Sequence, residues 1–168
     1  MDRGQATDRA SVARPVRVEV GLRTVRVTAV VPCFNRPQDL ATLVDDLRAC
    51  ELDAVYASGT GKPRAHVRIK LSVVVVDNAS DPPLEAPELG EHIGVRVVRL
   101  ARNTGGSGGY NAGMAAALTG DGAPASSPGP DYLWLVDSDA RVEPDTLAKL
   151  LGAMEADKSL VALGPVLL

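Results

Sequence analysis

Short apolar runs recur along this chain and alternate with stretches of helical pattern. The apolar runs, rich in β-branched residues, lie at 27–32, 71–76, 95–100, 132–136 and 161–163. Helical patterns cover 37–50 and 144–156, and a small-residue helix that follows the glycine-rich segment RNTGGSGGYNAGM is expected to run to about 119. The second run, LSVVVV, is almost continuously apolar, as is typical of a central parallel strand covered on both faces. The alternation predicts an α/β fold with a mainly parallel sheet and helices on both faces.

The connections divide the chain into a lead-in and one domain. Residues 1–26 carry six arginines among polar neighbours, and we expect a partly ordered lead-in there. Residues 27–168 are expected to form one domain, because an apolar content of 45% suits a single sizeable core. Glycine, proline and polar residues are frequent at 51–70 and 121–131. We therefore expect an insertion loop in the first of these segments and a loop before the fourth strand in the second.

Net charge and hydropathy limit the classes of partner. The net charge of −3 argues against a nucleic-acid-binding surface. No stretch approaches the ~20 apolar residues that span a bilayer, and the N-terminal segment lacks the apolar core of a signal peptide. We expect a cytoplasmic protein, with peripheral membrane association only through partners or through sequence outside this chain.

Polar or aromatic residues stand at the ends of four predicted strands. They are the segments 34–36 (FNR), 77–78 (DN), 102–103 (RN) and the acid pair Asp137 and Asp139. Taken singly, each has an ordinary explanation as a turn former, a cap or a solvated side chain. Because the carboxyl ends of parallel strands share one edge of a sheet, we expect all four groups to converge there on a ligand site.

The acid pair and a glycine-rich segment carry the chemistry of this predicted site. Asp137 and Asp139 flank one serine after an apolar run. Two close carboxylates indicate either Mg²⁺ or Mn²⁺ holding phosphates, or a raised pKa for acid–base work, and solvation of a strand end is the simpler alternative. Glycines at 105–109 allow backbone to approach a ligand closely. They complete neither GxGxxG nor GxxxxGK[ST], which disfavours a dinucleotide fold and a P-loop ATPase.

The cysteines and histidines give no separate site. Cys33 and Cys50 form no CxxC pair, and His66 and His92 lie far apart in the chain, so neither zinc nor a disulfide framework is indicated. A nucleophilic Cys33 would need a histidine base, and no neighbouring residue supplies one. We expect both cysteines to be small buried apolar residues.

Four segments carry a family resemblance. VVPCFNRPQDLATLV, VVVVDNAS, RNTGGSGGYNAGM and YLWLVDSDA follow one another along the chain. In this order they resemble the blocks of family 2 glycosyltransferases with a GT-A fold, and the resemblance extends over roughly 27–168. The third block is most similar to bacterial galactofuranosyl- and rhamnosyltransferases that build cell-wall glycans. The resemblance implies a Rossmann-like, mainly parallel sheet, here truncated after the fifth strand.

The resemblance also implies where a nucleotide sugar binds. The implied contacts are Pro32, Cys33, Phe34, Asn35, Arg36, Asp77, Asn103, Gly105, Asp137 and Asp139. Phe34 matches an aromatic residue that stacks on the nucleobase. Asp77 matches a carboxylate that accepts from N3–H of the base, which implies a UDP- or dTDP-sugar. Asn103 and Gly105 match the segment along the ribose and phosphates.

A DxD-like motif completes the implied site. Asp137 and Asp139 match this motif, which holds Mn²⁺ or Mg²⁺, and Asp139 is the first choice as metal ligand. The implied reaction is an inverting transfer to a glycan or lipid-linked acceptor in cell-wall polysaccharide synthesis, in the cytoplasm or at the inner face of the plasma membrane. The family's general base lies beyond the fifth strand, and no residue of this chain is assigned that role.

Two alternatives to a transferase remain from the residues alone. A catalytically incomplete nucleotide-binding or scaffold domain would keep the fold and lose the dependence on metal. A nucleotidyltransferase also combines a parallel sheet with metal-bound aspartates. Its glycine-rich phosphate loop should follow the first strand, where this chain has PCFNRP.

Overall fold

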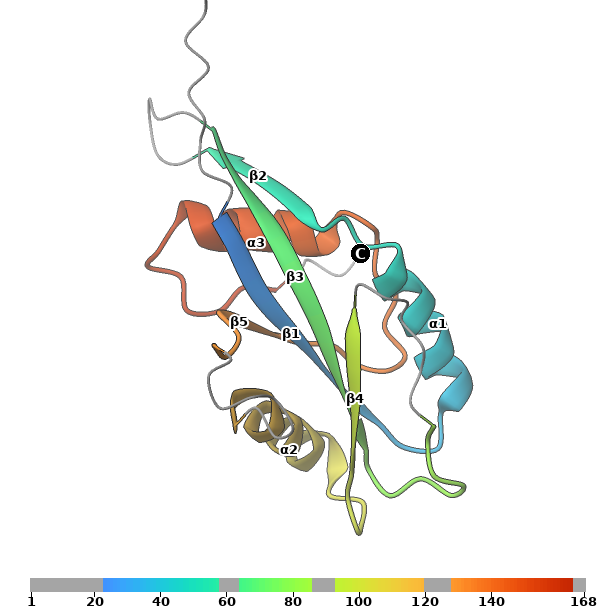
Figure 1. Cartoon of the computed structure of the whole chain (residues 1–168). Helices are drawn as coiled ribbons and strands as arrows, with labels where there is room; N and C mark the ends of the chain where they lie inside the picture. The colour runs from blue at the N-terminus through green and yellow to red at the C-terminus, as the bar shows by residue number, and fades with distance from the viewer. Residues whose placement is uncertain (1–22, 58–63, 86–92, 120–127, 165–168) are drawn as a thin grey trace, which may run out of the picture.

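The computed structural model describes residues 23–57, 64–85, 93–119 and 128–164. The strands are β1 (Arg23–Cys33), β2 (Asp53–Ala57), β3 (Arg64–Asp77), β4 (Gly94–Arg99) and β5 (Tyr132–Leu135), joined in one sheet (Figure 1). The helices are α1 (Pro37–Arg48), α2 (Gly105–Thr119) and α3 (Thr146–Ala156). The described strands pair in parallel except for β2 with β3, so the predicted α/β class with a mainly parallel sheet is confirmed.

The long strand β3 organises the sheet. One edge of β3 pairs in parallel with β1 over the whole of β1, so that Cys33 lies opposite Asp77. The other edge pairs first with β2, antiparallel, and then with β4, parallel. On the far side of β1, β5 completes the order β2-β3-β1-β5. The carboxyl ends of β1, β3 and β4 therefore meet at one edge, as the sequence predicts.

The expected insertion loop at 51–70 is wrong, because β2 and the first half of β3 lie there. Val67 and Ile69 are buried while Arg68 and Lys70 are exposed. This alternation is that of a strand with one covered face, which an analysis based on continuous apolar runs overlooks. The connection between the two strands lies outside the described residues. The lead-in also contributes to the sheet, since β1 begins at Arg23.

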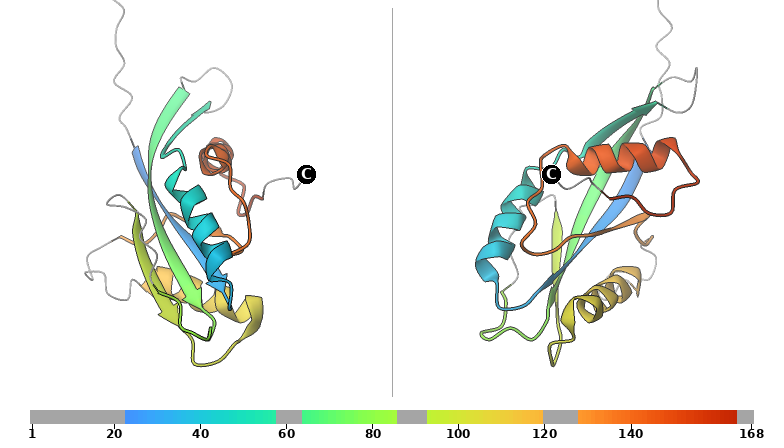
Figure 2. Two further views of the ribbon diagram at one scale, coloured as in Figure 1. Left: turned by 90° about the vertical axis from the view of Figure 1, so that its right-hand side faces the viewer. Right: turned by 180° about the vertical axis from the view of Figure 1, so that it is seen from behind.

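Helices cover the two faces of the sheet. On one face, α1 and α3 pack over the larger core (Figure 2). The sequence pattern predicts an apolar stripe on each of these helices. Helix α1 buries all of its stripe, namely Leu40, Leu43, Val44 and Leu47. Helix α3 buries Leu147 and Leu151, and leaves Leu150 and Met154 of its predicted stripe half-buried. On the other face, α2 packs over a smaller cluster centred on Val30, Val74 and Val76. Within the described ranges, no helix is both long and apolar enough to cross a membrane.

Glycines let α2 lie close against the sheet. A Cβ atom added at Gly113 would overlap the side chains of Val30 and Val76, and one added at Gly109 would come within 2.9 Å of Pro32 Cβ. Only a residue without a side chain fits such a close approach. The glycine-rich beginning of α2 is thereby held against the end of β1, next to the predicted site.

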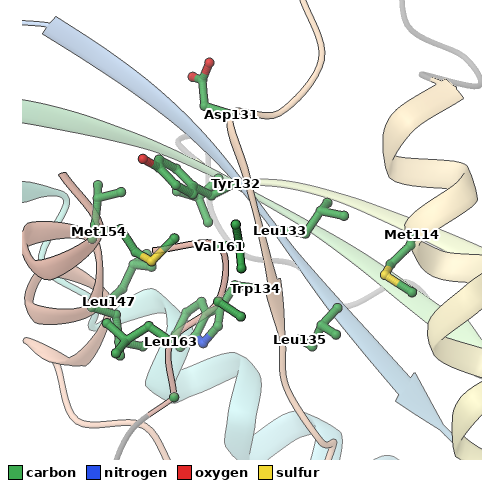
Figure 3. Close-up of a pocket in the computed structure, with 15 residues that line it drawn as sticks. Met114, Asp131, Tyr132, Leu133, Trp134, Leu135, Leu147, Met154, Val161 and Leu163 are labelled. Carbon is green, nitrogen blue, oxygen red and sulfur yellow. The ribbon is translucent and has the colours of Figure 1, made fainter. Parts of the chain in front are cut away.

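At the edge of the sheet, β5 sends alternate side chains to opposite faces. Figure 3 shows Tyr132 and Trp134 on the side of α3, and Leu133 and Leu135 on the side of Met114 in α2. A hollow of about 520 Å³ lies along this edge, and its lining is mostly apolar. It contains neither acid of the DxD-like motif, so it is distinct from the predicted ligand site.

The strand expected at 161–163 is wrong. Residues 161–164 have no strand assignment, and the side chain of Val161 is 96% exposed. Three apolar residues are too few to identify a strand, and no described strand pairs with them. The sequence predicts this run as the fifth strand. In the structure the fifth strand is β5, because β2, which was not predicted, adds one strand before it.

Candidate functional site

The ends of β1, β3 and β5 and the beginning of α2 surround a hollow of about 450 Å³. The residues that line it are Pro32, Cys33, Phe34, Arg36, Asn78, Asn103, Gly105, Gly106, Asp137, Ser138 and Asp139. All the predicted contacts except Asn35 and Asp77 are among them. The convergence of distant polar segments that the sequence predicts is therefore present. Their binding roles remain predictions.

Phe34 and Asn35 form the turn that leads from β1 into α1. The Phe34 side chain is 42% exposed and lines the hollow. Asn35 adopts a positive φ of 55°, a conformation that asparagine tolerates better than most residues. Its backbone N–H donates to Ser80 Oγ and its Oδ1 accepts from the N–H of Asp81. Asn35 thus fixes the turn that presents Phe34, although it does not itself line the hollow.

Asn78 ties two walls of the hollow together. Its Oδ1 accepts from both the backbone N–H and the hydroxyl of Thr104, at 2.9 and 3.1 Å. Its Nδ2 donates to Asn103 Oδ1 and to the carbonyl of Gly105, both at 3.1 Å. The sequence predicts Asn78 among the strand-end residues that converge, because it directly follows a predicted central strand, with a turn former as the ordinary alternative. Its hydrogen bonds across the hollow were not predicted.

Asp77 is enclosed behind the hollow. Its carboxylate accepts from the N–H groups of Ser80 and Leu84, at 2.8 and 3.2 Å, and forms an ion pair with Arg99. Burial by itself raises the pKa of Asp77, but the hydrogen bonds from Ser80 and Leu84 and the charge of Arg99 outweigh it and lower that pKa. The carboxylate is therefore ionised and holds the turn after β3. Its predicted contact with a nucleobase stays a prediction.

The acids of the DxD-like motif have different partners. Tyr110 Oη donates to Asp137 Oδ1 at 2.7 Å, and Arg36 Nη1 donates to Asp139 Oδ2 at 3.3 Å. Both acids are exposed, whereas Ser138 between them is buried. Burial, followed by the hydrogen bond and charge of Asp137 and the charge of Asp139, raises the pKa of Tyr110. The phenol therefore keeps its proton and acts as a donor.

The donor set of the hollow suits a hard divalent cation. Among the described residues, no group of three or more His, Cys, Asp or Glu side chains is arranged to hold a metal. Two exposed carboxylates nevertheless match the way Mg²⁺ is bound in many enzymes, by one or two carboxylates together with substrate phosphates. Asp137 and Asp139 therefore fit a cation whose remaining ligands come from a phosphorylated substrate and water.

The cysteines are buried, as predicted. Burial raises the pKa of the Cys33 thiol, and burial raises that of Cys50 to about 11. Cys33 Sγ donates to the carbonyl of Arg36 at 3.5 Å, so it stabilises the turn beside the hollow. A protonated thiol is a poor nucleophile, which is consistent with a structural role.

Comparison with known proteins finds relatives that are described as galactofuranosyltransferases. Galactofuranosyltransferase GlfT1 of Mycobacterium tuberculosis (strain H37Rv) is 29% identical over 145 residues, which cover 85% of this chain and 40% of the relative. Galactofuranosyltransferase GlfT1 of Mycolicibacterium smegmatis is 31% identical over 140 residues, covering 83% of this chain and 38% of the relative. The chain spans about two fifths of the length of these relatives.

Solved structures give a weaker likeness. The crystal structure of S. aureus TarS 1-349 aligns with a TM-score of 0.49 and 18% identity, over 78% of this chain and 32% of that chain. The same protein in complex with UDP aligns with a TM-score of 0.49 and 17% identity, over the same shares.

The family model described as glycosyl transferase family 2 matches residues 28–167. Because this match covers most of the chain, the chain belongs to glycosyl transferase family 2.

Proposed function

We propose that this chain forms the donor-binding part of an inverting glycosyltransferase that uses a UDP- or dTDP-sugar with Mn²⁺ or Mg²⁺. The observation that carries the proposal is the hollow at the sheet edge, where two exposed carboxylates face a glycine-rich helix start and an aromatic side chain. The acceptor would be a glycan or a lipid-linked saccharide in cell-wall polysaccharide synthesis. The reaction would take place in the cytoplasm or at the inner face of the plasma membrane.

The nucleobase would occupy the side of the hollow near β1. Phe34 is half exposed there, so a flat base can stack on its ring. The Asp77 carboxylate accepts from the backbone N–H groups of Ser80 and Leu84, and the Ser80 side chain and Arg99 also contact it. This carboxylate would accept from the N3–H group of uracil or thymine once the residues that enclose it move apart.

The diphosphate would lie between α2 and the DxD-like motif. Backbone N–H groups at the beginning of α2 favour negative charge, and Asn103 and Gly105 stand at this helix start. Arg36 adds a cationic side chain across the hollow. Asp137 and Asp139 would hold the Mn²⁺ or Mg²⁺ ion, which when bound neutralises the charge that develops on the departing diphosphate.

The relatives suggest the sugar. Both curated proteins are named as galactofuranosyltransferases, so we propose a galactofuranosyl residue as the group transferred. A rhamnosyl residue is the second candidate. Whether the site prefers a uracil or a thymine base would help to decide between the two sugars. No described residue is assigned the role of the general base that an inverting transfer requires.

Calorimetric titration with UDP and dTDP, with and without Mn²⁺, tests this proposal directly. We expect Mn²⁺-dependent binding that Asp139→Ala abolishes. Asp157→Ala is the matched control, because this exposed acid lies at the end of α3 and bonds only locally to Ser159. Binding that needs no metal and survives Asp139→Ala would favour the scaffold alternative. The nucleotidyltransferase alternative is weakened because the glycine-rich segment follows β4 and not β1.

A further inference from the structure

The geometry points to Tyr110 as a positioning residue for the cation, a step that rests on the proposed function. Tyr110 Oη donates to Asp137 Oδ1 at 2.7 Å. Among the described residues, Asp137 Oδ2 has no hydrogen-bond partner. The phenol therefore orients the carboxylate and leaves one oxygen available to a metal ion.

Tyr110 is well placed to fix this carboxylate because its ring is anchored. The ring packs against the apolar cluster beneath α2, which includes Val30 and Val76. One turn later on the same helix face, Gly113 lies against the same two valines. The close packing of α2 on β1 and β3 therefore restricts where the hydroxyl can lie. The apolar cluster thus holds the Tyr110 ring, and the Tyr110 hydroxyl in turn holds Asp137.

The second acid of the motif lacks such an anchor. Asp139 pairs with Arg36 at 3.3 Å, and the Arg36 and Asp139 side chains are 59% and 57% exposed. The same Arg36 nitrogen also donates to Asp39. Asp137 is thus held by a group rooted in the core, and Asp139 by a solvated side chain. We assign Asp137 as the preorganised ligand and Asp139 as the acid that exchanges its partner when the cation enters.

Two effects of the phenol on metal affinity oppose each other. Its hydrogen bond withdraws some negative charge from Asp137, which weakens ligation, and it fixes the orientation of the carboxylate, which strengthens ligation. Loss of such outer partners typically lowers metal affinity about 10- to 100-fold, so orientation outweighs charge. Because the site is open to solvent, we expect the lower end of that range, about tenfold.

Titration of Mn²⁺, followed by the electron paramagnetic resonance signal of the free ion, tests this inference with and without UDP. Tyr110→Phe removes only the hydroxyl, and we expect the affinity for Mn²⁺ to fall about tenfold. Tyr132→Phe is the matched control. The Tyr132 hydroxyl also donates to a carboxylate at 2.7 Å, but its acceptor is Glu155, outside the hollow. We expect Tyr132→Phe to bind Mn²⁺ as the unmodified chain does.

The outcomes separate this inference from the proposed function. Equal Mn²⁺ affinity in Tyr110→Phe and the unmodified chain overturns the positioning role. An equal loss in Tyr132→Phe also overturns it, because the effect would then come from general loosening. If Mn²⁺ binds but neither UDP nor dTDP does, the proposed function fails while the Mn²⁺ titration still decides the role of Tyr110. If Mn²⁺ does not bind under any of these conditions, both fail.

Discussion

Arg36 and Asp139 form an ion pair across the mouth of the hollow, with Nη1 and Oδ2 3.3 Å apart. The pair joins the residue before α1 to the segment after β5, two parts of the chain that are distant in sequence. Arg36 thereby supplies positive charge at the acid that the sequence singles out as the first metal ligand. A cation and Arg36 cannot both satisfy the same carboxylate oxygen fully, so we expect them to compete.

Replacing Arg36 by glutamine should have opposite effects on metal and nucleotide. Without its competitor, Asp139 should bind Mn²⁺ alone more tightly, by up to about fivefold, since an exposed ion pair contributes roughly 0.2–1 kcal/mol. Binding of UDP in the presence of Mn²⁺ should weaken, because the diphosphate loses a cationic partner. Paramagnetic resonance measures the first effect, and calorimetry measures the second.

Arg48→Gln is the control for this pair of measurements. Arg48 forms an exposed ion pair with Asp45 at 2.8 Å at the far end of the same helix. We expect it to leave both affinities unchanged. A weaker affinity of Arg36→Gln for Mn²⁺ alone would contradict competition at Asp139.

Asp77→Asn should destabilise the fold by about 3 kcal/mol. Removing one partner of a buried ion pair costs about 3–5 kcal/mol, and we expect the low end because the partner, Arg99, is partly exposed. The amide would present N–H groups where Ser80 and Leu84 donate and where Arg99 carries its charge. Urea unfolding measures the loss. Asp131→Asn is the control, because Asp131 pairs with Arg26 near the surface and its loss should cost less than about 1 kcal/mol. Equal losses in the two variants would contradict the role given to the enclosed carboxylate.

The same carboxylate should govern part of the acid sensitivity. The pKa of Asp77 is lowered in the folded protein by its hydrogen bonds and by Arg99, against the opposing effect of burial. Its contribution is therefore complete above the unfolded value of about 3.9 and is lost as the pH falls below that value. The difference in unfolding free energy between the unmodified chain and Asp77→Asn should shrink below about pH 4. A constant difference between pH 6 and pH 3 would contradict this assignment.

The sequence predicted the convergence of the site because parallel strands end at one edge whatever their spacing in the chain. Phe34, Asn103 and Asp139 could therefore be grouped before any contact was known. Tyr110 could not, because its role depends on a hydrogen bond that exists only once α2 is docked on the sheet. Asn78 was grouped with the other strand ends, but its bonds to Thr104 depend on the same docking. The helix itself was predicted, but periodicity did not indicate which face of α2 packs on the sheet, since its small residues form no apolar stripe.

Errors in the fold have a similar origin. The first half of β3 was not predicted because Arg68 and Lys70 alternate there with buried residues, and strands were identified from continuous apolar runs. The run at 161–163 was counted because it is apolar, although a strand also needs a neighbour to pair with. Both errors concern pairing partners, which local composition does not specify.

Gly113→Ala should destabilise the protein although alanine favours helices. Alanine gains about 1 kcal/mol over glycine in a helix interior, but the added methyl group would overlap both Val30 and Val76. Overpacking costs about 1–3 kcal/mol, and two obstructing side chains favour the upper end, so we expect a net loss near 2 kcal/mol. Gly106→Ala is the control in the same helix, because no atom lies within 4 Å of an added Cβ there. It should leave stability unchanged or raise it, and a gain in both variants would contradict the packing of α2.

Phe34→Ala should weaken binding of UDP and dTDP by similar factors. Base stacking on an aromatic side chain contributes about 1–3 kcal/mol and depends little on substituents such as the thymine methyl group. The unfolding free energy should change little, because Phe34 is 42% exposed. Leu118→Ala, which truncates an exposed apolar side chain near the end of α2, should leave nucleotide binding intact. If Phe34→Ala binds both nucleotides as the unmodified chain does, the base does not stack at the end of β1. The nucleobase would then have to occupy a different part of the hollow.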